Sequence, residues 1–255
     1  MIIKRFVVFG DVHGKQDAMY ETALRLQDRS KMAIDAVLQV GDFETIRTLD
    51  DLRQYYAPAE YHRVSDIVDY CSGVKQAPFF TAFIGGNHEA WTVLAEHNDG
   101  GFICPNIYYL GRAKAIDVKG VRVGGLTGIF NRDLYDVPLP EVPDWSWEVY
   151  RREAIDKLRS ELKLDILLLH DWIRPYSEIN PTDEESIPDG MRDDRVHTPT
   201  YELVTKIRPK HVFMGHKHVP YVEGGIGETH VVGLREFRDG TDPHSYHILE
   251  IEVNE

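Results

Sequence analysis

Five short apolar segments, each followed at once by a loop of glycine and polar residues, constrain the fold of this chain most strongly. The segments are short and rich in β-branched and aromatic residues, which is typical of buried strands. Amphipathic segments between them, such as Gln16 to Arg29 and Trp147 to Leu162, predict helices. This alternation of strand and helix predicts a layered α/β fold. The five predicted strands are Ile2 to Phe9, Ala36 to Val40, Phe79 to Ile84, Asp165 to Leu169 and His211 to Met214.

A second group of strands has the pattern of antiparallel pairs. Ala113 to Val118 and Val121 to Leu126 flank Lys119-Gly120, which predicts a hairpin turn. The segments Glu228 to Leu234 and Ser245 to Val253 have a similar pattern. Two sheets packed face to face, with helices outside, would accommodate both groups of strands.

Two long segments lack a strand or helix pattern. They are Asn131 to Ser146 and Ile173 to Pro199, and the second includes an acidic stretch from Thr182 to Asp194. Long irregular loops in a compact domain are usually functional or mobile. We find neither an internal repeat nor a linker, so we predict one domain over residues 1–255.

Net charge limits the kind of partner. The chain has 42 Asp plus Glu against 29 Lys plus Arg, a formal net charge of -13. A long phosphate backbone therefore gains no general attraction, and we expect no extended basic surface. A small or locally recognised phosphate substrate fits this charge better.

Cysteine usage and hydropathy bear on location. Only Cys71 and Cys104 occur, at unrelated positions, so we expect two reduced core thiols rather than a disulfide framework or a zinc site. The apolar run at the amino terminus is too short for a signal sequence, and no segment has the roughly 18 to 20 apolar residues of a membrane span. We therefore expect a cytoplasmic protein without a membrane partner.

The loops that follow the five predicted strands contain the residues suited to chemistry. Ligands bind outside the carboxyl ends of strands in open α/β sheets, so we expect these loops to converge on one rim. Convergence would place two Asp, one Asn and four or five His in one pocket. The loops contain Gly10-Asp11-Val12-His13-Gly14, Gly41-Asp42-Phe43-Glu44, Gly85-Gly86-Asn87-His88-Glu89, His170-Asp171 and Gly215-His216-Lys217-His218.

Such a set of oxygen and nitrogen ligands suits Mn, Fe, Zn or Co better than calcium. Side chains two residues apart on an extended chain point to the same side, so Asp11 and His13 can chelate one ion, and His216 and His218 likewise. Asn87 offers a neutral carbonyl oxygen, and the Asp42 carboxylate can bridge two cations. With the ions roughly 3.5 to 4 Å apart, a bridging water is acidified and phosphate oxygens are clamped for displacement.

Each motif has a plainer interpretation when taken alone. The sequence Gly-Asp-x-His-Gly also suits a turn, and a lone strand-end histidine such as His170 is more often a hydrogen-bonded structural residue. The occurrence of all five motifs in order favours a metal centre. We interpret the remaining histidines as surface or core residues: His62, His97, His197, His211, His230, His244 and His247.

The ordered motifs, which span residues 10 to 218, resemble the calcineurin-like metallophosphoesterase superfamily. This resemblance implies a four-layer α-β-β-α sandwich, two mixed β-sheets flanked by helices, with the metal site in loops at the strand carboxyl ends. It also implies two divalent metal ions, Mn²⁺ first and Fe²⁺ or Zn²⁺ as alternatives. Asp42 would bridge them, and His88 would be the catalytic imidazole beside Asp42 and Asn87. The first ion would be held by Asp11, His13 and His218, and the second by Asn87, His170 and His216.

A narrower likeness is to the catalytic domain of RNA lariat debranching enzymes, which cleave the 2',5'-phosphodiester at an RNA branch point. Two departures stand out. Those enzymes usually have Cys where this sequence has Asp11, and Asn131 to Glu148, which corresponds to their lariat recognition loop, is poor in cations. The likeness rests on Phe83 to Ala90, Cys104 to Gly111, Val123 to Phe130 and Leu169 to Trp172.

Three functions follow from these observations. The first is a phosphodiesterase with a phosphate-ester substrate and local nucleic-acid contacts, in which Arg132, Arg174 or Lys217 binds a substrate phosphate. The second is a phosphomonoesterase of the Ser/Thr phosphoprotein or dinucleotide polyphosphate type, which the same motifs permit. The third is a noncatalytic scaffold, although such proteins tend to lose ligands or the catalytic His, and here all are present.

Overall fold

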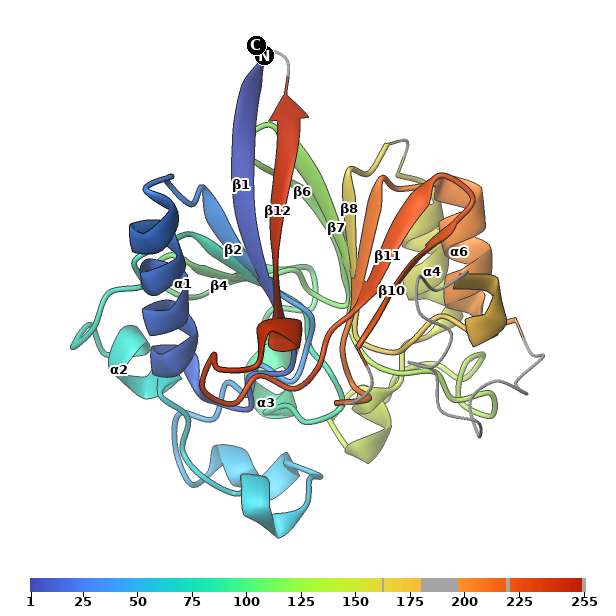
Figure 1. Ribbon diagram of the computed structural model, residues 1–255. Coiled ribbons are helices and arrows are strands. Elements are labelled where there is room, and N and C mark those ends of the chain that lie inside the picture. Colours follow the sequence, from blue (N-terminus) through green and yellow to red (C-terminus); the bar gives the residue numbers. More distant parts are fainter. Residues whose placement is uncertain (162, 180–196, 219–220, 254–255) are drawn as a thin grey trace.

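Two mixed β-sheets packed face to face occupy the centre of the molecule in the computed structural model (Figure 1). The structure describes residues 1–161, 163–179, 197–218 and 221–253. Helices lie outside each sheet, so the expected four-layer α-β-β-α sandwich is confirmed. The acidic stretch from Thr182 to Asp194 lies outside the described residues.

The first sheet joins the amino-terminal strands to the last strand of the chain. Its order is β12-β1-β2-β3-β5-β4, with β1, β2, β3 and β5 parallel and the two outermost strands antiparallel to their neighbours. The bounds are β1 Ile2–Phe9, β2 Ala36–Gln39, β3 Thr81–Phe83, β4 Gly101–Cys104, β5 Ile107–Tyr109 and β12 Tyr246–Val253.

The second sheet has the order β10-β11-β9-β8-β7-β6 and contains the predicted hairpin. Its four inner strands are parallel, and both edge strands are antiparallel to their neighbours. Lys119 and Gly120 have φ of 58° and 86°, the left-handed pair that a tight hairpin turn requires. The bounds are β6 Ala113–Val118, β7 Val121–Leu126, β8 Ile166–Leu169, β9 His211–Met214, β10 Val222–Ile226 and β11 Thr229–Gly233.

Helices cover the outer face of each sheet. On the first sheet, Met19 and Ala23 of α1 are fully buried, as the amphipathic pattern predicts. On the second, α4 and α6 lie side by side (Figure 1). The helices in the described part of the chain are α1 Gln16–Ser30, α2 Ile67–Cys71, α3 Trp91–Ala95, α4 Arg152–Arg159 and α6 Pro199–Ile207. The described 3₁₀ turns are η1 Asp51–Gln54, η2 Ala59–Tyr61, η3 Trp145–Glu148, η4 Tyr176–Ile179 and η6 Pro243–Ser245.

The layers create three main apolar clusters. One lies between the sheets and combines residues such as Val8 and Leu38 with Leu168 and Phe213. The other two lie between each sheet and its own helices. Inner strands such as β8 and β9 are buried on both faces, so their sequences are continuous apolar runs rather than alternating ones.

One predicted helix differs from the structure. The segment Trp147 to Leu162 contains the end of η3 and then α4, separated by extended backbone at Val149 and Arg151. Arg112 explains the break, because its guanidinium donates hydrogen bonds to the carbonyls of Trp147 and Val149. These carbonyls are therefore held by a distant side chain and not by a helix.

The expectation of two reduced thiols is wrong in this structure. Cys71, at the end of α2, and Cys104, at the end of β4, form a disulfide across 33 residues of sequence. Spacing alone could not reveal this pair, because the sheet order brings the two segments together. Disulfides are rare in cytosolic proteins, so the cytoplasmic location stays a prediction.

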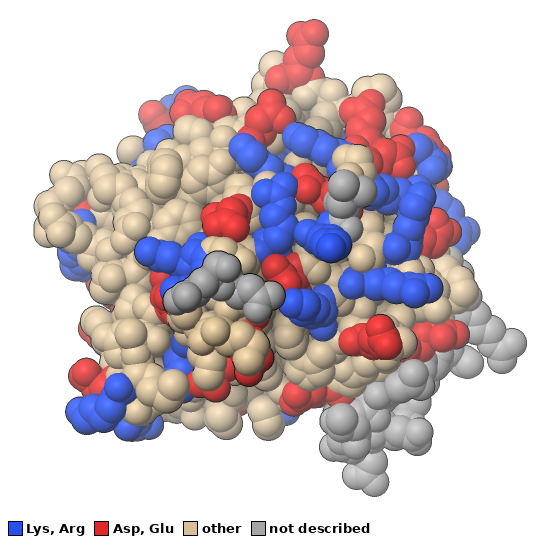
Figure 2. Space-filling model, turned by 90° about the horizontal axis from the view of Figure 1, so that it is seen from above, with Lys and Arg blue, Asp and Glu red and all other residues tan. Residues whose placement is uncertain are grey.

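Charged side chains at the strand amino ends are mixed in sign. Figure 2 shows Lys and Arg gathered on one part of this face, interleaved with Asp and Glu. The ion pair Arg122–Glu161 measures 2.8 Å, and Lys210–Asp165 also measures 2.8 Å. Among the described residues, no helix is both long and apolar enough to cross a membrane.

Candidate metal centre

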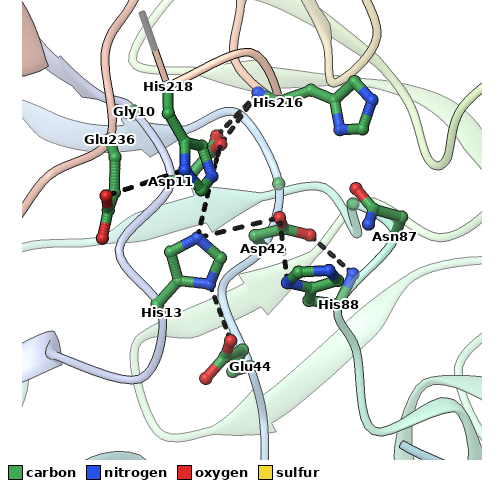
Figure 3. Close-up of polar contacts among 12 residues, drawn as sticks. Gly10, Asp11, His13, Asp42, Glu44, Asn87, His88, His216, His218 and Glu236 are labelled. Atoms are coloured by element: carbon green, nitrogen blue, oxygen red, sulfur yellow. Dashed lines mark hydrogen bonds and ion pairs between the residues drawn. The ribbon is translucent and has the colours of Figure 1, made fainter. Parts of the chain in front are cut away.

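The five loops predicted to converge do meet, at the carboxyl ends of strands from both sheets (Figure 3). Asp11, Asp42 and Asn87 follow β1, β2 and β3 of the first sheet. His170 and His216 follow β8 and β9 of the second. The site therefore lies where the two sheets face each other.

Four of the predicted ligands form one tight group. Asp11, His13, Asp42 and His218 each place one ligand atom within 4.8 Å of the other three. The Nε2 atoms of His13 and His218 are 3.2 Å apart, and His218 Nε2 lies 3.3 Å from Asp11 Oδ2. This is the set that the resemblance implies for the first ion, together with its bridging carboxylate.

The set implied for the second ion lies on the other side of Asp42. His170 Nε2 is 3.4 Å from Asp42 Oδ1 and 3.0 Å from Asn87 Oδ1. His170 Nδ1 donates to the Val40 carbonyl at 2.9 Å, which leaves Nε2 as the nitrogen with a free lone pair. The His216 ring lies 5.0 Å from the His170 ring. The structure thus brings all seven predicted ligands together, and their role in metal binding stays a prediction.

The backbone of the site is strained in a way that a functional site tolerates. His13, Asp42, His216 and His218 have φ of 44°, 53°, 68° and 56°, in the left-handed region that side chains other than glycine rarely adopt. Hydrogen bonds hold these loops: the buried Glu89 carboxylate accepts from the amides of Phe43, Glu44 and Gly86.

Glycines let the backbone approach the ligands closely. A Cβ at Gly215 would lie 2.1 Å from Asp11 Oδ1, and one at Gly86 would lie 2.1 Å from Asp42 Oδ1. Without a side chain at Gly215, the Asp11 carboxylate approaches the backbone and accepts a hydrogen bond from the His216 amide at 2.8 Å through Oδ2. The motif glycines are therefore needed for the ligand geometry.

Sequence reasoning did not assign the carboxylates behind two of the imidazoles. Glu44 Oε1 is 2.7 Å from His13 Nδ1, and it also accepts a hydrogen bond from Tyr55. Glu236 Oε2 is 3.6 Å from His218 Nδ1. In both imidazoles the carboxylate contacts Nδ1, whereas Nε2 points into the site. Glu44 ends its motif and so had a sequence signal, whereas Glu236 had none.

Charge in the site favours a cation. Burial opposes the charge of Asp42, but the imidazoles of His170 and His88 lower its pKa below the usual range. Burial lowers the pKa of His13, yet the hydrogen bond to Glu44 and the nearby carboxylates raise it overall to about 9. Burial also lowers the pKa of His216 to about 4. The raised pKa of His13 shows that the carboxylates around it create an excess of negative charge. Divalent cations bound by these side chains would neutralise that charge.

His88 lies at the edge of the ligand group. Its amide donates to Asp42 Oδ1 at 2.7 Å, and its Nδ1 is 3.9 Å from Asp42 Oδ2. Burial lowers the pKa of His88. The Tyr61 ring, which had no sequence signal, lies 4.3 Å from the His13 ring and 5.1 Å from the His88 ring. Arg63 donates to the His13 carbonyl at 2.6 Å.

The three cations predicted to bind substrate have different positions. Lys217 lies between two ligands, and its charge contributes to the lowered pKa of His216. Arg132 is exposed in the loop after β7. Arg174 is half-buried, and its amide donates to Thr198 Oγ1 at 3.2 Å. Their contact with substrate stays a prediction.

Comparison with known proteins agrees with this geometry. Residues 4–220 match the family model described as calcineurin-like phosphoesterase. The chain is 34% identical over 230 residues to the lariat debranching enzyme of Homo sapiens, covering 85% of this chain and 42% of that protein. It is 34% identical over 231 residues to the lariat debranching enzyme of Danio rerio, covering 85% of this chain and 40% of that protein. The chain thus spans less than half the length of these relatives.

A solved structure shows the fold. A protein from Thermus thermophilus superposes with a TM-score of 0.51 at 17% identity, covering 92% of this chain and 90% of that one. The match between family model, motif order and fold confirms the resemblance. This chain belongs to the calcineurin-like phosphoesterase family.

Proposed function

We propose that this chain is a two-metal phosphodiesterase that acts on a nucleotide or nucleic-acid substrate, with 2',5'-linked RNA as the leading candidate. The observation that supports it most is the gathering of Asp11, His13, Asp42 and His218 within 4.8 Å, with Asn87 and His170 alongside. The curated relatives that bear the name lariat debranching enzyme favour the diester.

In this proposal Asp11, His13 and His218 would hold one divalent cation, and Asn87, His170 and His216 would hold the other, with Asp42 as a ligand that both could share. Mn²⁺ is the ion we propose, with Fe²⁺ or Zn²⁺ as alternatives, because the ligands combine imidazole nitrogen with carboxylate and amide oxygen. When bound, such ions acidify a water and neutralise phosphate oxygens.

The residues of the chain supply the remaining chemistry. Asp42, fixed by the His88 amide, keeps its carboxylate at the centre of the site. The His88 imidazole, at the edge of the ligand group, is placed to donate a proton or a hydrogen bond to the leaving oxygen. Only 15% of its side chain is exposed, so the imidazole is largely shielded from bulk water.

RNA would be recognised locally. The net charge of -13 and the paired cations of the strand amino ends offer no continuous track for a long backbone. Asp11 replaces the Cys usual in debranching enzymes, so the first metal gains a hard anionic ligand, and we infer ordinary two-metal diester hydrolysis.

Hydrolysis of paired substrates tests this proposal. With Mn²⁺, we expect bis-p-nitrophenyl phosphate to be cleaved with at least tenfold higher kcat/KM than p-nitrophenyl phosphate. A 2',5'-linked diadenosine should then be cleaved in preference to its 3',5' isomer. A strong preference for the monoester would instead indicate a phosphomonoesterase. Absence of turnover with Mn²⁺, Fe²⁺ and Zn²⁺ would favour a noncatalytic scaffold.

A further inference from the structure

A cavity of about 370 Å³ opens beside the candidate metal centre. His218 forms one wall, and the rest of the described lining belongs to residues 235–242 in the connection between β11 and β12. We call it the β11–β12 cavity. Neither the sequence motifs nor the predicted ligand set accounts for it.

The lining of the β11–β12 cavity is polar and mixed in charge. Arg235 Nη1 lies 3.4 Å from Asp242 Oδ2, and Arg238 Nη2 lies 3.0 Å from Glu236 Oε2. The Thr241 hydroxyl donates to Asp239 Oδ1 at 2.6 Å. Two guanidinium groups thus face three carboxylates, and the cavity has no excess of positive charge.

One group in this lining lacks a partner within the described part of the chain. Arg235 Nε is buried and makes no hydrogen bond there, although 35% of the Arg235 side chain is exposed. A buried N–H without an acceptor costs about 1 to 3 kcal/mol. The Arg235 guanidinium is therefore incompletely satisfied, and the exposed part of its side chain forms part of the cavity wall.

These features point to a neutral polar ligand. A phosphate would meet more carboxylates than guanidinium groups, so charge does not favour it. A nucleoside offers both acceptors for Arg and N–H donors for Asp, the two kinds of partner that this lining presents. A volume of about 370 Å³ lies near the lower end of the range for small-molecule sites, which suits one nucleoside rather than an oligonucleotide.

Position relative to His88 indicates which nucleoside this is. The His13 ring lies 5.1 Å from the His218 ring and 5.5 Å from the His88 ring, so His13 neighbours both (Figure 3). The cavity begins at His218 and Glu236, on the other side of His13 from His88 (Figure 3), and in the proposed function His88 serves the leaving oxygen. The cavity therefore suits the group that stays on phosphorus.

We propose that the β11–β12 cavity binds the nucleoside that remains attached to the scissile phosphate, with Arg235 and Asp242 as its hydrogen-bonding partners. This assignment rests on the proposed phosphodiesterase function. It deepens that function by naming a specificity-determining arginine for nucleoside esters over simple aryl esters.

Two chromogenic diesters test the assignment, thymidine 5'-(p-nitrophenyl phosphate) and bis-p-nitrophenyl phosphate. Both release p-nitrophenolate, but only the first leaves a nucleoside on the phosphate. For Arg235→Ala, we expect KM for the nucleoside ester to rise about tenfold, as loss of a charge-assisted hydrogen bond implies. The fall in kcat/KM should be at least fivefold larger for the nucleoside ester than for the aryl diester. In Thr241→Trp, an exposed position, the larger side chain should fill the cavity. It should also lower kcat/KM more for the nucleoside ester than for the aryl diester.

Arg122→Ala is the matched control, because Arg122 also pairs with a carboxylate across the surface but lies at the strand amino ends. Arg122→Ala should leave kcat/KM unchanged for both diesters. Equal losses on both diesters in Arg235→Ala and Thr241→Trp, or no loss on either, would overturn the assignment.

Calorimetry separates this inference from the proposed function. Thymidine 5'-monophosphate should bind the Mn²⁺-loaded protein more tightly than inorganic phosphate, and Arg235→Ala should remove most of that difference. If the protein cleaves neither diester, the proposed function fails, and the calorimetric result alone decides the inference. Equal binding of the two ligands would overturn it.

Discussion

Two imidazoles of the site have a carboxylate behind them. Glu44 contacts His13 Nδ1 at 2.7 Å, and Glu236 lies 3.6 Å from His218 Nδ1. A carboxylate in this position fixes the ring orientation and the tautomer, so that Nε2 is the nitrogen available to a metal. The shorter of the two contacts, Glu44 to His13, is fully buried and is the one we expect to matter more.

Replacing Glu44 by Gln should weaken metal binding. The amide keeps the shape of the side chain but cannot supply the charge that stabilises the Nδ1–H of His13, so we expect Mn²⁺ affinity to fall about 10- to 100-fold. Titration calorimetry measures this directly. Tyr55→Phe removes the other hydrogen bond to Glu44 and should have a smaller effect. Unchanged affinity in Glu44→Gln would remove Glu44 from this role.

Replacing His88 by Asn should separate metal binding from turnover. His88 lies beside Asp42 but outside the seven predicted ligands, so the metal content should stay near that of the unmodified protein. Loss of a general acid lowers kcat by about 10²- to 10⁴-fold. Metal analysis and diester hydrolysis on the same preparation check both statements. Retained activity would show that His88 is not the proton donor.

At the scale of elements, the strand ends determine where the ligands lie. β9 ends at Met214, and Gly215 then turns the chain so that the His216 amide reaches Asp11. Because a Cβ at Gly215 would meet Asp11 Oδ1 at 2.1 Å, the strand end and the ligand cannot both keep their places if a side chain is added.

Gly215→Ala should therefore destabilise the fold and reduce metal binding together. Overpacking at a buried site typically costs about 1 to 3 kcal/mol, and here the displaced atom is a predicted ligand oxygen. Gly225→Ala in β10 is the control, since its Cβ would meet Thr229 O at 3.2 Å, a much milder overlap than the 2.1 Å at Gly215, and would meet no predicted ligand. Urea unfolding and Mn²⁺ titration measure the two effects. Normal metal binding in Gly215→Ala would mean that Asp11 is not held as described.

The sequence predicted these elements unevenly, for physical reasons. Buried parallel strands are apolar runs, so β1 and β9 were predicted with the bounds that the structure has. Short edge strands such as β4 and β10 have weaker patterns and were missed. The helix predicted from Trp147 was wrong at its start because Arg112 captures the carbonyls there. Local periodicity contains no information about such a distant side chain.

At the scale of the whole molecule, a histidine cluster joins the two sheets at one edge. His211 Nδ1 is 3.4 Å from His230 Nδ1, and His230 Nε2 is 2.9 Å from Glu223 Oε1. The His247 ring of β12 lies 6.0 Å from the His230 ring. Lys210 and Asp165 are the other charges that act on His211. All three histidines are half-buried, and their interpretation as surface or core residues stays a prediction.

This cluster predicts loss of stability in mild acid. Burial lowers the pKa of His211 to about 4, with the neighbouring histidines contributing in the same direction. The unfolded chain, with a histidine pKa of about 6.5, then binds more protons between these values, so stability falls as pH drops from about 6.5 towards 4. Since His211 is partly exposed, we expect about 1 kcal/mol from it rather than the full pKa difference.

Urea unfolding at pH 7.5 and pH 5 measures this dependence. His211→Gln should lose less stability between the two pH values than the unmodified protein, with EDTA present in both so that metal release does not contribute. An equal loss in the two proteins would show that His211 does not titrate as described.

The candidate site was more predictable than the fold around it. Each of these ligands lies in a short motif directly after an apolar strand segment. Asp11, Asp42 and His216 could therefore be named from the sequence alone. Tyr61, Glu236 and the β11–β12 cavity depend on how loops pack above the sheets, and no local pattern marks them. The Cys71–Cys104 pair likewise depends on sheet order.

Two cations sharing Asp42 are the central claim, and an anomalous-scattering map of Mn²⁺-soaked crystals tests it most directly. We expect two Mn peaks about 3.5 to 4 Å apart, one beside Asp11, His13 and His218 and one beside Asn87, His170 and His216. A single peak away from Asp42, or no peak at saturating Mn²⁺, would contradict the two-metal account.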